Sequence, residues 1–148
     1  MTTPLVAYLA LRTGEPKGFW HRVFSRLTRL RLVTGFDHGG IVLERGNARR
    51  LLDVNLARGL DSVPFDAVGW VLIPLNASTG MQAEKLFLAH KGAEYDWFSL
   101  LAFVLPWRVR DASRLYCFEW CWLAMTGENP DFKVTPEALI LKAIDLLP

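Results

Sequence analysis

The sequence has no apolar run long enough to cross a lipid bilayer. Its longest candidate, WFSLLAFVLPW (residues 97–107), contains Pro106 and is followed by Arg108, whereas a spanning helix needs about 20 apolar residues. The N-terminal run LVAYLAL has no basic residue before it and no small-residue cleavage site after it, unlike a secretory signal peptide. We therefore expect neither a transmembrane segment nor a signal peptide.

Cysteine is also scarce. The two cysteines, Cys117 and Cys121, are four residues apart in a segment with a helical pattern, where the backbone direction disfavours a disulfide between them. Two free thiols are typical of a reducing compartment, so we expect a cytoplasmic protein. A zinc site made by the two cysteines with His38 would have three ligands but lacks the Cys-x-x-Cys spacing typical of such sites. We expect no metal and no other cofactor.

The chain also lacks internal repeats, low-complexity tracts and linkers. Its 148 residues are 51% apolar and 22% charged, with six tryptophans and nine phenylalanines, which excludes a disordered chain. A chain of this length buries roughly two-thirds of its unfolded surface in one domain. We expect a single domain over residues 1–148.

Four segments have the patterns of strands. They are LVAYLAL (5–11), HGGIVLE (38–44), RRLLDVN (49–55) and VGWVLIPL (68–75). The Gly46-Asn47 pair between the second and third segments predicts a tight hairpin turn. These strands are expected to form a small antiparallel sheet.

Helical patterns occupy much of the remaining chain. One helix is expected from Thr79 to about His90, with Ser78 or Thr79 as its N-cap and Gly92 as its stop. Three others are expected in YDWFSLLAFVL (95–105), in RLYCFEWCWLAM (114–125) before Gly127, and in TPEALILKAI (135–144), where Thr135 caps and Pro136 takes the first helical position. Helices at both ends of a small sheet indicate an α+β fold.

The segment from Gly18 to Val33 predicts an amphipathic helix. Its apolar side, expected to face the core, comprises Phe19, Trp20, Val23, Phe24, Leu27 and Leu30, and its polar side comprises Arg22, Ser25, Arg26 and Arg29. From Arg12 to Arg31 there are six Lys/Arg and one Glu, although the net charge of the whole chain is +2. The polar side is either an ordinary solvated surface or a contact for an anionic polymer or membrane through Arg22, Arg26 and Arg29. One basic helix does not indicate nucleic-acid binding.

Cys117 is the better candidate for a reactive thiol. It lies near the start of its predicted helix, where free backbone N–H groups and the positive end of the helix dipole favour a thiolate. Cys121 lies one turn further on, between Trp120 and Trp122, and is expected to be a buried apolar residue. The nucleophile, if the chain has one, is Cys117.

His38 is the candidate base. It heads a predicted strand and precedes Gly39 and Gly40, which would let another chain segment or a substrate approach the backbone, whereas His21 and His90 are expected at the surface. Asp53 lies on the strand predicted to pair with that of His38. Its carboxylate would orient the imidazole through the second ring nitrogen.

These segments resemble a known enzyme family. Their order along the chain resembles that of the circularly permuted branch of the NlpC-type papain-like cysteine peptidases and amidases. The matching parts are a strand, a helix, FDHGGIVL, a hairpin, LLDVN, YDWFSLL, LYCFEWCWLAM and VTPEAL. In that branch the histidine strand precedes the nucleophile helix, and lecithin-retinol acyltransferase-like proteins are relatives. The resemblance extends from about Leu5 to Leu139 and implies a papain-like fold.

The resemblance also implies roles for single residues. His38 matches the general base, Cys117 the nucleophile and Asp53 the orienting residue, a variable position for which Asn55 and Glu44 are substitutes. Glu119 matches a carboxylate often found after the nucleophile. Phe118 stands where the family usually has serine, which suggests a bulkier, more apolar rim beside the thiol.

The family's activities set the expected function. A triad of Cys117, His38 and Asp53 would cleave an amide or ester through a thioester acyl-enzyme, with cell-wall peptides the first candidate substrate in a bacterial or phage context and a virion-associated location if the protein is phage-encoded. A lipid acyl hydrolase or acyltransferase is an alternative, with Trp97, Trp107, Trp120 and Trp122 as candidates to line an acyl groove. A further alternative is a non-catalytic phage structural module on the same fold.

Overall fold

A computed structural model describes residues 5–14, 17–32, 35–96 and 114–148 of the chain. Five antiparallel strands form one sheet in the order β4-β3-β2-β1-β5. The strands are β1 (Leu5–Arg12), β2 (His38–Arg45), β3 (Ala48–Asn55), β4 (Gly59–Pro64) and β5 (Trp70–Leu75). The described helices are α1 (Phe19–Leu32), α2 (Ala77–His90), α4 (Cys117–Thr126) and α5 (Pro136–Ile144). The α+β class expected from the sequence is confirmed.

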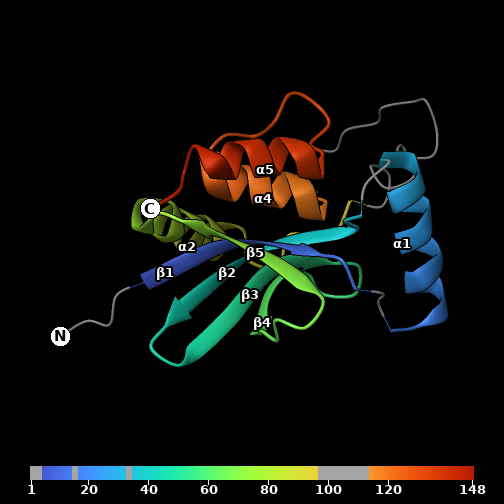
Figure 1. Ribbon diagram of the computed structural model, residues 1–148, viewed down its shortest axis with the longest axis horizontal. Helices are drawn as coiled ribbons and strands as arrows, with labels where there is room; N and C mark the ends of the chain where they lie inside the picture. Colours follow the sequence, from blue (N-terminus) through green and yellow to red (C-terminus); the bar gives the residue numbers. More distant parts are fainter. Residues whose placement is uncertain (1–4, 15–16, 33–34, 97–113) are drawn as a thin grey trace.

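Helices α2, α4 and α5 lie on one side of the sheet (Figure 1). Between them and the strands is the main apolar core, to which the sheet contributes Leu9, Leu11, Ile41, Leu52 and Val54. A smaller cluster of Ala10, Val42 and Leu51 packs with partly buried side chains that include Trp70. Because neighbouring strand residues point to opposite faces, these two clusters lie on the two faces of the sheet.

The predicted strands are all present, and the structure adds β4. The sequence of β4, GLDSVP, contains glycine, proline, aspartate and serine, which have low strand propensity, so sequence patterns did not predict it. Pairing with β3 stabilises it, with Leu60 buried opposite Val54. The predicted hairpin turn is confirmed, with Gly46 at φ 60°.

Helix α2 begins earlier than predicted. Asn76 is the N-cap, and its side-chain oxygen accepts a hydrogen bond of 2.9 Å from the backbone N–H of Thr79. The hydroxyls of Ser78 and Thr79 donate to the same oxygen, so the prediction that either residue is the cap was wrong. Both lie inside the first turn.

The C-terminal end of α4 and the N-terminal end of α5 agree with their predicted signals, but α4 begins at Cys117 and not at Arg114, because Leu115 forms a bridge to Tyr95. Gly127 follows α4 in the left-handed conformation, with φ 78°. Thr135 caps α5 through a hydrogen bond from the N–H of Ala138, and Pro136 begins the helix. The helix predicted over residues 95–105 falls from residue 97 onward outside the described residues.

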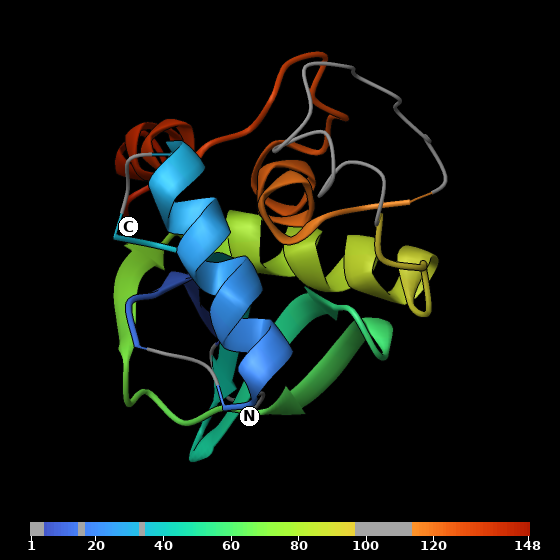
Figure 2. The same cartoon turned by 90° about the vertical axis from the view of Figure 1, so that its right-hand side faces the viewer.

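Helix α1 stands at one end of the sheet, apart from the other helices (Figure 1), and in the view from that end it lies in front of the strands (Figure 2). The predicted orientation of this helix was wrong for Phe19, Leu30 and Ser25. Phe19 and Leu30 are 67% and 81% exposed, whereas Ser25, predicted on the solvated side, is buried at 6%. Arg29 also points inward, donating to the carbonyl oxygens of Thr13 and Gly14.

The reason for this orientation is a buried acid. Asp37 accepts a hydrogen bond from the hydroxyl of Ser25, and its Oδ1 lies 3.7 Å from Nη2 of Arg29. A buried carboxylate needs polar partners, and α1 supplies them from its polar side. Arg22 and Arg26 are exposed, as expected. The side chains of Trp20, Phe24 and Leu27 lie outside the described part of the chain.

Candidate active site

His38 and Asp53 are in direct contact. His38 is the first residue of β2, and its Nε2 lies 2.8 Å from Oδ2 of Asp53 on the neighbouring strand β3. Their side chains are only 14% and 5% exposed. The ring of Trp70 meets the imidazole edge-to-face at a centroid distance of 5.9 Å. The imidazole is therefore held by a carboxylate and an aromatic ring.

The two glycines after His38 make this packing possible. A Cβ on Gly40 would lie 2.6 Å from Cδ1 of Leu51 and 3.2 Å from Cβ of Asp53, so glycine leaves room for the carboxylate-bearing strand. A Cβ on Gly39 would lie 3.1 Å from the ring of Phe118 and 3.2 Å from the sulfur of Cys121. Glycine at both positions thus permits the expected close approach, and the approaching segment is α4.

Cys117 is the first residue of α4 and is 5% exposed. The residue before it, Tyr116, is extended and acts as the N-cap, with its carbonyl oxygen accepting from the N–H of Trp120. The thiol therefore lies at the N-terminal end of a helix, where the helix dipole favours negative charge. This position is the one that the sequence predicted.

The imidazole of His38 interacts with Cys117 as well as with Asp53. Burial alone would lower the pKa of His38, but the negative charge of a Cys117 thiolate and the hydrogen bonds to Asp53 and Cys117 raise that pKa to about 9. Because Nε2 contacts Asp53, Nδ1 is the nitrogen left to face the thiol. The three predicted residues thus meet at one imidazole, whose protonated form is favoured by its partners.

Cys121 has a different environment. It is completely buried beside Gly39. Burial, and then the charge of Cys117, raises the pKa of the Cys121 thiol well above its ordinary value, so this cysteine stays protonated. Both cysteines are free, as expected.

The two alternatives to Asp53 have other contacts. The side-chain oxygen of Asn55 accepts from the N–H of Ala57 at 2.9 Å, and Glu44 accepts from Nε of Arg49 at 2.6 Å. Asp53 itself keeps one oxygen, Oδ1, buried without a hydrogen-bond partner among the described residues. Nη2 of Arg58 lies 3.8 Å from that oxygen.

A cleft of about 270 Å³ opens beside the pair of His38 and Asp53. Its lining is mixed and includes apolar side chains, two arginines and two aspartates. The described residues that line it are Arg12, Ser25, Asp37, His38, Leu51, Asp53, Val54, Asn55, Leu56, Arg58, Val63, Trp70 and Tyr95. The described lining includes the imidazole and its carboxylate and does not include Cys117.

Sequence reasoning did not assign a role to Asp37, which precedes His38. Its carboxylate is fully buried and accepts two hydrogen bonds from Arg12, from Nε at 3.1 Å and from Nη2 at 3.2 Å. Arg12 in turn lies over the ring of Trp70, 5.9 Å from its centroid, and Trp70 contacts His38. An acid directly before a histidine and two glycines was the available signal, but its partners Arg29, Ser25 and Arg12 all lie on earlier elements of the chain.

Tyr95 is a second residue without an assigned role, which the sequence marked only as the start of the segment YDWFSLL. It is 8% exposed and forms an isolated parallel bridge with Leu115, two residues before Cys117. Burial, and then the charge of Cys117, raises the pKa of the Tyr95 hydroxyl well above its ordinary value. A neutral tyrosine hydroxyl therefore lies in the neighbourhood of the thiol.

Two expectations for aromatic residues of α4 were wrong. Phe118 does not form a rim beside the thiol, because it is 1% exposed and packs against Gly39. Trp120 does not line a groove, because it is fully buried and its indole N–H donates to the carbonyl of Leu52 at 2.9 Å. Trp122 packs edge-to-face on Phe132. Glu119, the family's carboxylate position, is buried.

Within residues 5–14, 17–32, 35–96 and 114–148, no cluster of three or more His, Cys, Asp or Glu could hold a metal ion. No helix in those ranges is long and apolar enough to span a bilayer. The sequence matches no model of a known protein family, and a search of curated proteins finds no significant match.

Proposed function

We propose that the protein is a cysteine hydrolase of the amidase or peptidase type, with Cys117 as nucleophile, His38 as base and Asp53 as the residue that orients His38. The observation that carries the proposal is the 2.8 Å contact between His38 and Asp53, made by an imidazole that also interacts with a cysteine at a helix start. The fold and the resemblance described above support the same assignment.

The chemistry follows from these groups. The Cys117 thiolate attacks a carbonyl carbon, and the resulting oxyanion accepts a hydrogen bond from the backbone N–H of Cys117 at the helix start. His38 gives its proton to the leaving amine or alcohol, which leaves a thioester on Cys117. His38 then takes a proton from water, whose oxygen attacks the thioester and releases the acid and the thiolate.

Asp53 acts through His38. By accepting from Nε2, its carboxylate keeps the proton on that nitrogen in the neutral imidazole and directs Nδ1 to the thiol. It also stabilises the imidazolium when the ring is protonated. Trp70 limits rotation of the ring from a second direction.

The first experiment tests the thiol without a known substrate. Iodoacetamide should alkylate Cys117 well below ~pH 8, because a thiolate paired with an imidazolium reacts where an ordinary thiol does not. Cys121 is the matched internal control, since it is on the same helix, fully buried and held as a thiol. Peptide mass spectrometry after brief labelling measures both sites. Equal or absent labelling of the two cysteines in the folded protein would contradict the proposal.

The second experiment addresses the substrate. We propose cell-wall peptides or related amides as the substrate class, following the resemblance. Incubation with purified peptidoglycan and, separately, with acyl-ester lipids, followed by mass spectrometry of the products, distinguishes an amidase from a lipid acyl hydrolase. The exposed apolar residues of α1, Phe19 and Leu30, are the observation that keeps the lipid substrate as second candidate.

A further inference from the structure

The outward side of α1 combines exposed apolar side chains with cations. Phe19, Arg22, Arg26 and Leu30 follow one another at spacings of three, four and four residues, which places them along one side of a helix. Phe19 and Leu30 are 67% and 81% exposed, and both arginines are exposed. Lys17 is also exposed, just before the helix. We call these five residues the α1 stripe.

The orientation of the α1 stripe is fixed by the opposite side of the helix. Ser25 and Arg29 are turned toward the buried carboxylate of Asp37, and Arg29 also donates to two backbone carbonyls at 2.8 and 3.1 Å. Rotating α1 to bury Phe19 and Leu30 would remove these partners from a buried charge, at a high cost in free energy. The helix therefore keeps Phe19 and Leu30 in solvent.

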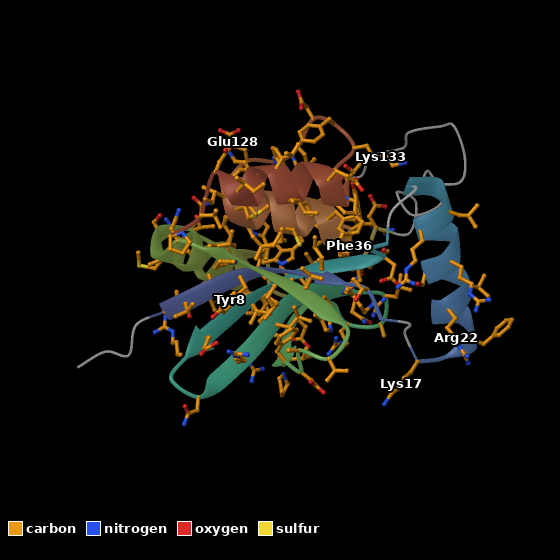
Figure 3. All side chains as sticks on the ribbon, in the orientation of Figure 1. Tyr8, Lys17, Arg22, Phe36, Glu128 and Lys133 are labelled. Atoms are coloured by element: carbon orange, nitrogen blue, oxygen red, sulfur yellow. The ribbon has the colours of Figure 1, made fainter. Side chains whose placement is uncertain are left out.

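The charge of this region has one sign. Residues 17–32 contain Lys17 and four arginines and no Asp or Glu. In Figure 3, Lys17 and Arg22 lie near the N-terminal end of α1, at the edge of the molecule. Arginine side chains lay their apolar stems beside apolar neighbours and extend the charged group to phosphates, so the stripe is complementary to a surface that is anionic outside and apolar just beneath.

We propose that the α1 stripe docks the protein on an anionic lipid bilayer, with Phe19 and Leu30 inserted at the level of the headgroups and Lys17, Arg22 and Arg26 against lipid phosphates. A helix that lies in the membrane interface has this composition. A hydrated wall polymer would match the cations but offers no apolar layer for Phe19 and Leu30. The proposal concerns binding alone and does not require the hydrolase activity.

The docked orientation places the candidate site at the membrane. Asp37, which holds α1, is the residue before His38, and Arg12 links Asp37 to the cleft that His38 lines. The bilayer would therefore lie at the end of the molecule that carries the imidazole.

Vesicle co-sedimentation tests the proposal with the full chain. The protein should bind vesicles of phosphatidylcholine mixed with phosphatidylglycerol, and bind phosphatidylcholine alone far more weakly. Each cation near such a surface contributes ~1 kcal/mol, so Arg22→Gln together with Arg26→Gln should weaken binding roughly 30-fold. Raising the salt from ~0.01 M to ~0.15 M should also weaken it, because the screening length falls from ~30 Å to ~8 Å.

A second double variant tests the two apolar residues of the α1 stripe. Phe19→Ser with Leu30→Ser should reduce binding at least ~10-fold at the higher salt concentration, because the transfer of both side chains to the interface is lost. Two matched controls should bind as the wild type does: Lys85→Gln with Lys91→Gln, which removes two exposed charges elsewhere, and Leu88→Ser with Leu141→Ser, which removes two residues exposed by 70% and 68%.

Three results would overturn the proposal in proteins whose folding is checked by circular dichroism. These are equal loss of binding in the control variants, no preference for vesicles with phosphatidylglycerol, or sedimentation with purified peptidoglycan in preference to vesicles. Cys117→Ser should bind vesicles normally, so failure of the hydrolase proposal and failure of the docking proposal give different results.

Discussion

Helices α4 and α1 show two ways in which a helix is attached to the same sheet. Eight of the ten residues of α4 are buried, and the helix lies on the sheet through Phe118, Trp120 and Cys121. Helix α1 has the stronger amphipathic pattern, yet it exposes Phe19 and Leu30 and is held by polar contacts to Asp37. The comparison teaches that the polar partners of a buried acid can fix the orientation of a helix even where this leaves Phe19 and Leu30 exposed.

The two helices also differ in what they contribute to the protein. The dense packing of α4 fixes the position of Cys117 against His38, and a chemical step needs such precision. Helix α1 contributes no predicted catalytic residue, and its attachment fixes which residues face outward. Variants in α4 should therefore change turnover, whereas variants in α1 should change the attachment of that helix and the surface that it exposes.

The largest difference is expected between the two cysteines of α4. Cys117→Ser should lower turnover by ~10⁴-fold or more, because a hydroxyl at this place is a far weaker nucleophile. Cys121→Ser should keep most of the activity and mainly reduce stability. Turnover of an identified substrate, with circular dichroism as the folding check, measures both. Equal loss in the two folded variants would remove Cys117 from its proposed role.

The next largest effect is expected at the imidazole. His38→Ala should lower turnover by ~10²–10⁴-fold, the usual contribution of a general base. Asp53→Ala should lower it less, because Asp53 orients the ring through its 2.8 Å contact and does not itself carry the proton. Rate measurements across pH compare the two variants. Near-normal turnover of His38→Ala would contradict the papain-like mechanism.

A third prediction concerns the attachment of α1. Asp37→Ala should lower the free energy of unfolding by about 3 kcal/mol, because it leaves Arg12 and Arg29 partly buried without their carboxylate. Hydrogen exchange should speed up in α1 and stay slow in α4. Glu84→Ala is the control, since it breaks only the exposed ion pair with Arg45 and should cost less than about 1 kcal/mol. Equal exchange changes in α1 and α4 would show that the two attachments are not independent.

Much of the fold was predictable because it depends on local signals. The strands at 38–44 and 49–55 were recognised from their apolar patterns and the turn between them, and the ends of α4 and α5 from Gly127, Thr135 and Pro136. Strand β4 was not recognised, because its formation depends on pairing with β3 rather than on its own residues.

The residues of the candidate site could be predicted from the sequence, but the packing around them could not. The pairing of the strands of His38 and Asp53 follows from the hairpin, so their contact could be anticipated. The inward turn of Ser25 and Arg29 could not, because nothing local indicates that Asp37 is buried. The burial of Phe118 and Trp120 depends on the contact of α4 with Gly39 and Leu52, which lie far away in the sequence.

A fourth prediction tests the attachment of α4. In Gly39→Ala the new Cβ would lie 3.1 Å from the ring of Phe118 and 3.2 Å from the sulfur of Cys121. The ring of Phe118 or the side chain of Cys121 must then move by a few tenths of an ångström, which should cost about 1–3 kcal/mol of stability and lower turnover by disturbing the helix that carries Cys117. Gly35→Ala is the control in the same segment, because nothing lies within 4 Å of its Cβ position. Chemical denaturation measures both variants, and equal stability would contradict the described packing.

The smallest expected effect is a change in the pKa of His38 on β2, which tests the influence of Cys117 at the start of α4. The pKa of His38 is about 9 because the charge of Cys117 and the hydrogen bonds outweigh burial. In Cys117→Ala that charge is absent, so burial has a larger net effect and the imidazole should lose its proton at a lower pH. Nuclear magnetic resonance of the imidazole nitrogens follows the titration, with Cys121→Ala as the matched control that should leave the pKa near 9. In the wild type, turnover should fall as pH rises through about 9, because the imidazolium that protonates the leaving group is lost. An unchanged titration in Cys117→Ala would mean that the thiol does not hold the proton on His38, and the ion pair between α4 and β2 would have to be abandoned.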